Sequence, residues 1–132
     1  MKNFFLLVLV ILLQACAPES NHSNKAAKML SDQVIAAWEG EIPCADCPGI
    51  LYSLDLKKDN NYSEKLVYLE KSVEPFVNNG TWSIAADSVI TLTPATNEGS
   101  TQFLLYNGEQ VQMLDGDGKK IETQLNYKLH KK

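Results

Sequence analysis

The sequence predicts an all-β protein, folded as a small antiparallel up-and-down barrel of roughly eight strands. Apolar and polar residues alternate with a period of two in several runs after Val34, as they do in strands that have one buried face. Gly, Pro, Asn and Asp interrupt these runs about every eight to twelve residues. The sequence after Val34 shows no amphipathic helix of useful length, so short turns are expected to join consecutive strands.

The predicted strands are residues 38–42, 50–56, 62–69, 81–84, 88–93, 101–106, 110–114 and 121–129. The last of them shows the clearest alternation, because one face carries Ile121, Thr123, Leu125, Tyr127 and Leu129. Residues 70–79, which include Pro75, are predicted to form a looser connection between the third strand and the fourth. Pro94 is expected to end the fifth strand, since proline cannot donate a hydrogen bond to a ladder.

Two turns are predicted from their residues. Asn107-Gly108 predicts a hairpin with a type I′ turn, in which both central residues need a positive φ. Asp115-Gly116-Asp117-Gly118 predicts a second turn. This second stretch begins like a calcium-binding EF-hand loop but lacks the glycine at the sixth position and the glutamate at the twelfth, so no calcium site is expected.

Closure of the sheet into a barrel suits about eight strands in about a hundred residues, because it removes the exposed sheet edges. A barrel of this size has an interior that side chains fill, or that is just wide enough for one small ligand. The competing architecture is a β-sandwich, which would need longer crossover connections, and only residues 70–79 are a candidate for one. The barrel is therefore the expected fold, over residues 34–132.

The N-terminus resembles a bacterial lipoprotein signal. Lys2 precedes an unbroken apolar run over residues 4–13, which is too short to cross a bilayer but suits the hydrophobic region of a signal peptide. Leu13-Gln14-Ala15-Cys16 then resembles a lipobox, in which the cysteine becomes the diacylated N-terminus. Residues 1–15 are thus expected to be a signal peptide, and the polar residues 16–33 a flexible tether.

Two alternatives stay open for this segment, namely a plain signal peptide with a chance cysteine and an uncleaved anchor. With lipid on Cys16, more than one acyl chain would hold the protein, because a single chain binds a membrane only marginally. Ala17 stands where an aspartate would resemble the inner-membrane retention signal of Gram-negative bacteria. The protein is therefore expected in the cell envelope, anchored by lipid in the outer membrane of a Gram-negative bacterium.

The charge of the chain excludes one class of partner. The net charge is −4, all 12 basic residues counted are lysines, and acidic and basic residues are scattered along the chain. The sequence has no basic stripe that could displace counterions from phosphates. We therefore expect no nucleic acid as a partner.

The functional prediction depends on residues 43–49, Pro-Cys-Ala-Asp-Cys-Pro-Gly, which lie between the first two predicted strands. Four of these residues are expected to shape the loop: Pro43, Asp46, Pro48 and Gly49. With Cys16 acylated, the other two cysteines are the only free thiols of the sequence. A disulfide between them is the default in the oxidising compartment outside the inner membrane. Its stabilising effect should be small, because chain-entropy stabilisation grows with loop length.

Four interpretations of Cys44-x-x-Cys47 remain open. A thiol oxidoreductase would need a helix after the motif to depress the thiol pKa, and the sequence predicts a strand there. A soft-metal site could hold Cu(I) or half of a zinc site, but no histidine lies nearby and Asp46 is too hard a ligand for Cu(I). The other two interpretations are a rigid or redox-poised loop that a partner protein contacts, and a local disulfide with no further role. No cofactor is expected, with copper as the open alternative.

An enzyme is not predicted. The sequence shows no serine in the context of a nucleophile elbow, no glycine-rich phosphate loop and no carboxylate pair in an apolar setting. The aromatic residues Trp38, Trp82 and Tyr127 are expected in the barrel core rather than in a ligand cage.

Four groups of residues resemble the N-terminal domain of the NlpE family, envelope lipoproteins linked to copper tolerance and surface sensing. They are residues 43–50, Asn79-Gly80-Thr81-Trp82, Met113-Leu114-Asp115 with Gly118, and Leu125-Asn126-Tyr127 with Leu129. The Cys-Ala-Asp-Cys-Pro-Gly core of the first group is specific, and the other groups support it. The resemblance covers residues 34–129 and does not extend to the second, OB-like domain of full-length members, so signalling through that domain's cysteines is not carried over.

This resemblance implies a lipocalin-like barrel, held by lipid in the outer membrane, that alerts the Cpx two-component system to defects in the envelope. In that picture an inner-membrane sensor kinase of the Cpx type contacts the domain when the lipoprotein is mislocalised. We therefore expect a non-enzymatic lipoprotein that acts in envelope-stress sensing or copper tolerance through the loop of Cys44 and Cys47. Two alternatives remain: a lipocalin-like binding module for a small apolar ligand, and a direct thiolate copper-binding protein.

Overall fold

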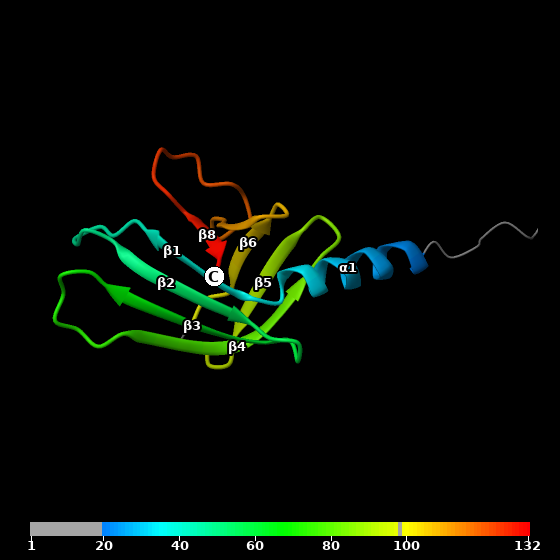
Figure 1. The fold of residues 1–132 in the computed structure, drawn as a ribbon, viewed down its shortest axis with the longest axis horizontal. Helices are drawn as coiled ribbons and strands as arrows, with labels where there is room; N and C mark the ends of the chain where they lie inside the picture. The colour runs from blue at the N-terminus through cyan, green and yellow to red at the C-terminus, as the bar shows by residue number, and fades with distance from the viewer. Residues whose placement is uncertain (1–19, 98) are drawn as a thin grey trace, which may run out of the picture.

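The computed structural model describes residues 20–97 and 99–132, which form a closed antiparallel β-barrel with a helix before it (Figure 1). The elements in chain order are α1 (Ser20–Val34), β1 (Ala37–Ile42), β2 (Ile50–Leu56), β3 (Asn61–Tyr68), β4 (Phe76–Ile84), β5 (Val89–Pro94), β6 (Gln102–Tyr106), β7 (Gln110–Met113) and β8 (Lys128–Lys131). Each strand pairs with the next, and β8 pairs with β1. The predicted all-β class and up-and-down topology are confirmed.

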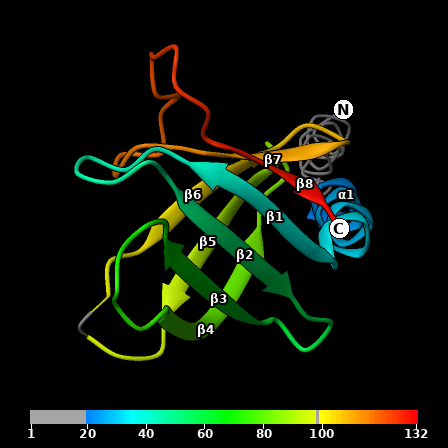
Figure 2. The same ribbon diagram turned by 60° about the vertical axis from the view of Figure 1, so that its left-hand side comes forward.

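The strands follow one another in order around the barrel wall (Figure 2), but neighbouring strands pair over different lengths. β2 and β3 pair along their whole length, from Ile50 with Tyr68 to Leu56 with Tyr62. β1 and β8, in contrast, pair only at Trp38 with Lys131 and at Glu39 with His130. The barrel is therefore closed by a short seam.

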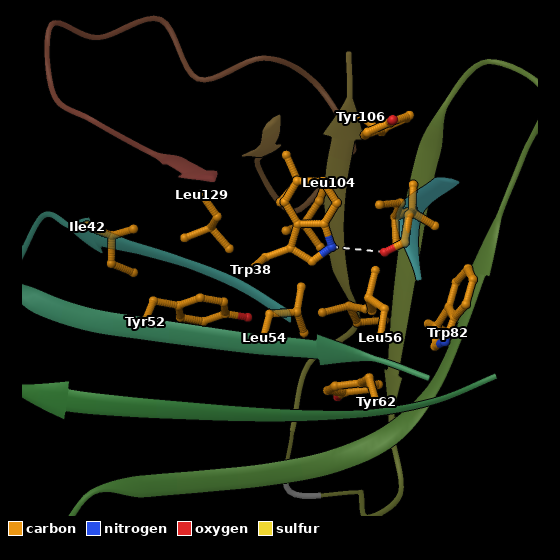
Figure 3. Packing of buried hydrophobic residues seen from close by; sticks show 14 of the residues in the cluster. Trp38, Ile42, Tyr52, Leu54, Leu56, Tyr62, Trp82, Leu104, Tyr106 and Leu129 are labelled. Atoms are coloured by element: carbon orange, nitrogen blue, oxygen red, sulfur yellow. Dashed lines mark hydrogen bonds between the residues drawn. The ribbon is translucent and has the colours of Figure 1, made fainter. Parts of the chain in front are cut away.

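Alternate residues of each strand fill the interior of the barrel. In β2, every second residue from Ile50 to Leu56 is buried and those between them are exposed. The buried cluster is apolar and rich in aromatic side chains, among them Trp38, Tyr52, Tyr62, Trp82 and Tyr106 (Figure 3). Trp38 and Trp82 thus lie in the core as expected, whereas Tyr127 is only half-buried.

The prediction of a flexible tether is wrong for residues 20–33, which belong to α1. The last turn of α1 packs on the barrel, since Val34 is fully buried and Leu30 contacts the core cluster. Trp38 Nε1 also donates a 2.9 Å hydrogen bond to the carbonyl oxygen of Val34 (Figure 3). Only this end of the helix meets the barrel, so no apolar stripe along the sequence signals it. Within the described part of the chain, α1 is too short and too polar to span a bilayer.

The predicted final strand over residues 121–129 is also wrong. β8 spans only Lys128–Lys131, and residues 114–127 form a long loop before it. Side chains within this loop bond to backbone groups that a ladder would otherwise use: Thr123 Oγ1 accepts from the N–H of Leu125 at 3.1 Å, and Asn126 Nδ2 donates to the carbonyl of Glu41 at 3.0 Å. Leu125 is consequently 60% exposed.

Of the two turns predicted from their residues, one is confirmed and the other has a different type. The turn at Asp115 is confirmed, because Asp115 Oδ1 accepts hydrogen bonds from the N–H groups of Asp117 and Lys119 at 2.9 and 2.8 Å. The β6–β7 hairpin is present, but the type I′ turn is wrong, since Gly108 has a positive φ of 100° and Asn107 does not. Instead Asn107 Oδ1 accepts hydrogen bonds from the backbone N–H groups of Glu109 and Gln110.

The long connections lie together at one end of the barrel. Because neighbouring strands run in opposite directions, the connections after β1, β3, β5 and β7 share an end, and α1 lies at the other end (Figure 1). We call the first end the long-loop end; its connections are residues 43–49, 69–75, 95–101 (without residue 98) and 114–127. The connection over 69–75 is shorter than predicted, because β4 begins at Phe76, directly after Pro75.

Candidate functional site

The loop over residues 43–49 connects β1 to β2 at the long-loop end. Cys44 and Cys47 form a disulfide in this loop, with their Cα atoms 5.3 Å apart. Both cysteines are half-buried and pack against the core cluster. The disulfide that the sequence predicted is therefore present, and it shapes a tight turn on the apolar rim of the barrel.

Backbone contacts hold this loop against its neighbours. The carbonyl of Gly49 accepts a 3.0 Å hydrogen bond from the N–H of Leu69, the residue directly after β3. Gly49 is buried, and a Cβ at this position would come within 2.4 Å of Glu41 Oε1. A side chain there would have to displace the exposed, flexible side chain of Glu41.

An ion pair fixes the tip of the loop. The carboxylate of Asp46 contacts the ammonium group of Lys71, in the connection between β3 and β4. The hydrogen bond from Lys71, together with its charge, lowers the pKa of Asp46. Asp46 is exposed, so this pair orients the loop and adds little to global stability.

Cys44, Asp46 and Cys47 form a group that could bind a metal if the disulfide were reduced. One ligand atom each from Cys44, Asp46 and Cys47 lies within 4.8 Å of the others. In the disulfide, the sulfur atoms have no thiol proton and no thiolate charge, so they are poor ligands. Cys44 Sγ lies 3.6 Å from Asp46 Oδ1, and Cys47 Sγ lies 3.2 Å from the carbonyl oxygen of Gly49. After reduction these close contacts can become thiol hydrogen bonds.

A shallow hollow of about 400 Å³ lies beside the disulfide loop. Its lining comes from the end of β1, from the disulfide loop and from the β7–β8 loop: Glu41, Ile42, Pro43, Cys44, Pro48, Leu125 and Asn126. Pro43 and Pro48 therefore border this hollow as well as shaping the loop. The sequence did not predict Leu125 and Asn126 here, because the expected long final strand would have placed them in the barrel wall.

Comparison with known proteins identifies the family. The model of the NlpE N-terminal domain matches residues 38–124, which is most of the barrel and includes the disulfide loop. The chain belongs to the NlpE family. The NlpE-type residues Asn79–Trp82 lie in β4, where Gly80 is buried and a Cβ would come within 2.0 Å of the carbonyl oxygen of Thr93.

Two relatives of this NlpE-family chain have known structures. The chain is 38% identical over 95 residues to lipoprotein NlpE of Escherichia coli K12, covering 70% of this chain and 39% of that protein. The crystal structure of that Cpx pathway activator matches with a TM-score of 0.60, over 70% of this chain and 48% of the other. A candidate lipoprotein from Shewanella oneidensis matches with a TM-score of 0.62 at 35% identity, over 74% and 87% of the two chains. The chain thus spans less than half of the E. coli relative.

One polar cluster inside the barrel of this NlpE-family chain was not expected from the sequence. Glu64, on the inner face of β3, is 1% exposed. Its carboxylate accepts hydrogen bonds from the hydroxyl of Tyr52, from Gln102 Nε2 at 3.0 Å and from Asn78 Nδ2 at 3.1 Å. These donors come from β2, β6 and β4, so the cluster ties four strands together across the interior.

The signal for this cluster was present in the alternation of β3. Glu64 occupies an inward position between Tyr62 and Leu66, where an apolar residue is expected. The cluster also affects its tyrosines. Burial, followed by the charge of Glu64, raises the pKa of Tyr62 to about 12. The same causes raise the pKa of Tyr52 well above its usual value.

Proposed function

We propose that this chain is a non-enzymatic envelope lipoprotein that signals envelope stress through the long-loop end of its barrel. The supporting observation is the 38% identity, over most of the barrel, to a protein that activates the Cpx pathway. The proposed partner is an inner-membrane sensor kinase of the Cpx type. The proposed anchor is lipid on Cys16, which lies outside the described residues, and the proposed location is the outer membrane.

The geometry of the long-loop end supports a protein partner. The disulfide and the contacts of Asp46 and Gly49 hold the loop in one conformation, so little conformational entropy would be lost on binding. The exposed Leu125 and the adjacent hollow offer an apolar contact next to the exposed charge of Asp46. Such a mixture of an apolar centre and a charged rim is typical of transient protein interfaces.

A reporter assay tests this function. The chain is overproduced in cells that carry a reporter under a Cpx-controlled promoter, as wild type and as the variant Asp46→Lys. Glu109→Lys is the matched control, since it makes the same charge change in the exposed turn at the opposite end of the barrel. We expect the wild type and the control to activate the reporter and Asp46→Lys to lose most of the response. Equal activation by all three would contradict the proposed surface, and no activation by the wild type would contradict the function.

Lipid attachment has its own test. Intact mass of the protein from native envelopes, combined with labelling by radioactive palmitate, should show acyl chains that disappear in Cys16→Ala. An unmodified Cys16 on a chain that retains residues 1–15 would contradict the proposed anchor.

Direct copper binding is a second candidate, favoured by the closeness of Cys44, Asp46 and Cys47. Two thiolates suit Cu(I), so this function requires a reduced pair in the envelope. A free-thiol count and an intact mass, measured with and without copper, distinguish a reduced, copper-binding cysteine pair from an oxidised one. A reduced pair that gains the mass of one copper would support the metal site, whereas an oxidised pair unaffected by copper would contradict it. The apolar-ligand alternative is less supported, because large side chains such as Trp38 and Tyr52 occupy the interior.

A further inference from the structure

Glu64 is a buried carboxylate that has no cationic partner. Neither of the two ion pairs found in the described part of the chain involves it. Its hydrogen-bond donors are neutral, namely the hydroxyl of Tyr52 and the side-chain amides of Asn78 and Gln102. A buried charge without a counter-ion is costly in a folded protein, and this cost falls when a cation binds beside it.

The barrel wall opens next to this carboxylate. β4 pairs with β3 from Phe76 onward, but it pairs with β5 only from Gly80 onward, because β5 ends at Pro94. Residues 76–78 of β4 have no partner in β5 and face the β5–β6 connection across a hollow of about 450 Å³, while the carbonyl of Asn79 accepts a 2.9 Å hydrogen bond from the N–H of Ala95. The hollow is lined by residues 76–79 and by Ala95, Thr96 and Gly99. Small-molecule sites have volumes of about 300 to 1,000 Å³.

Asn78 connects the hollow to the carboxylate. Its side chain lines the hollow, while its Nδ2 lies 3.1 Å from Glu64 Oε1 and 3.4 Å from the hydroxyl oxygen of Tyr62. Asn78 is half-buried, whereas Glu64 behind it is inaccessible. Among the described residues that line the hollow, Asn78 is thus the one whose side chain contacts Glu64.

The rim of the hollow is apolar. Phe76 is 53% exposed and Val77 is 56% exposed, both on the unpaired part of β4. An apolar rim in front of a carboxylate whose only partners are neutral donors suits a molecule with an apolar body and a positively charged head. An ammonium group has three donors, enough for Glu64 Oε1, the hydroxyl of Tyr62 and the oxygen of the displaced amide.

We propose that the hollow between β4 and the β5–β6 connection binds a small amphiphile with an ammonium head group, and that Glu64 selects its positive charge. The head group takes the place of the Asn78 amide on Glu64, and the apolar body packs on Phe76 and Val77. No covalent bond is made or broken. The site is separate from the disulfide loop, so its failure would leave the proposed signalling function untouched.

The test compares two probes of equal chain length, n-hexylammonium and n-hexanol. The full chain, labelled with ¹⁵N and held in phospholipid nanodiscs, is titrated with each probe, and empty nanodiscs correct for partitioning into lipid. We expect n-hexylammonium to bind at least about tenfold more tightly than n-hexanol. The side-chain amide signals of Asn78 and Gln102 should shift with saturation. Equal binding of the two probes, or shifts confined to another surface, would overturn the proposal.

Glu64→Gln assigns the selectivity, since it removes the charge and keeps the shape. We expect this variant to bind n-hexylammonium about tenfold less tightly and n-hexanol unchanged. Glu74→Gln is the matched control, because it neutralises an exposed glutamate in the nearby β3–β4 connection and should keep the preference. A preference that survives Glu64→Gln would overturn the proposal. If Glu64→Gln does not fold, Val77→Lys decides: a cation on the rim should weaken n-hexylammonium alone, and an unchanged preference would overturn the site.

Discussion

The carboxylate of Asp46 contacts the ammonium group of Lys71, so two loops that are 25 residues apart in sequence are joined at one end of the barrel. This contact lies at the tip of the disulfide loop, next to the end of β1. It couples the conformation of residues 43–49 to that of the β3–β4 connection, which leads to β4.

Lys71→Ala should loosen the disulfide loop without unfolding the barrel. The pair is exposed, and exposed ion pairs contribute little to global stability. We therefore expect faster amide hydrogen exchange at Ala45 and Asp46 and an unchanged unfolding midpoint. Lys132→Ala, which breaks the exposed pair with Glu39 at the seam of the barrel, is the control and should leave exchange in the loop unchanged. Unchanged exchange in Lys71→Ala would show that the disulfide and the Gly49–Leu69 hydrogen bond fix the loop without the ion pair.

Replacement of both Cys44 and Cys47 by serine should leave the barrel folded. The disulfide closes a very short loop, so its loss should cost about 2 kcal/mol or less of unfolding free energy. Urea unfolding followed by tryptophan fluorescence measures this, because Trp38 and Trp82 lie in the core. An unfolded double variant would contradict a local role for the disulfide and make it a main support of the fold.

Gly80→Ala should destabilise the barrel strongly, because the added Cβ would meet the carbonyl oxygen of Thr93 at 2.0 Å and the ring of Tyr62 at 2.7 Å. We expect a loss of about 1 to 3 kcal/mol in unfolding free energy, as overpacking gives in other cores. Gly116→Ala is the matched control, since a Cβ there would meet no atom within 4 Å, and it should change the free energy by less than about 0.5 kcal/mol. Equal effects of the two variants would contradict the close approach of β4 and β5.

The stability of the barrel should fall in alkaline solution because of Tyr52 and Tyr62. Folding raises the pKa of Tyr62 from about 10 to about 12 and that of Tyr52 well above its usual value. Their contribution is complete below pH about 10, where both states keep the proton. As the pH rises from about 10 toward about 12, the unfolded chain releases these protons first, so the folded state loses stability.

Tyr52→Phe and Tyr62→Phe should each reduce this alkaline loss. Urea unfolding at a series of pH values measures the slope for each variant, and Tyr127→Phe, outside the cluster, is the control. A slope as steep in Tyr52→Phe as in the wild type would show that lysine titration, rather than the buried cluster, dominates the alkaline loss. At neutral pH, Tyr52→Phe should also cost about 1 to 3 kcal/mol, because Glu64 loses a hydrogen-bond donor.

The sequence predicted the strands that have one clean buried face. The strand predicted over residues 50–56 is confirmed as β2, because a period of two has one structural interpretation when one face meets a core. The same pattern failed for residues 121–129, since side-chain to backbone bonds by Thr123 and Asn126 replace the ladder there. α1 was missed because Leu30 and Val34, at its last turn, are its apolar residues in the described core, too few to form a periodic stripe.

The candidate site was predictable where it is local in sequence. Cys44 and Cys47 lie three positions apart, and their types and spacing indicated the disulfide. Lys71 and Leu125 could not be assigned to the site, because nothing in a local pattern shows which distant loops share an end of the barrel. Glu64 was missed for another reason: a glutamate in an alternating strand is ordinarily a surface residue, and its burial depends on donors from three other strands.

The central claim is that the long-loop end of the barrel contacts a Cpx-type sensor kinase. Site-specific photocrosslinking tests it most directly, with a photoreactive residue placed at Leu125, beside the disulfide loop, or at the exposed Asp87 in the β4–β5 turn at the opposite end. Under conditions that activate the reporter, we predict a kinase adduct from position 125 and none from position 87. Adducts from position 87 alone, or equal adducts from both positions, would contradict a contact at the long-loop end.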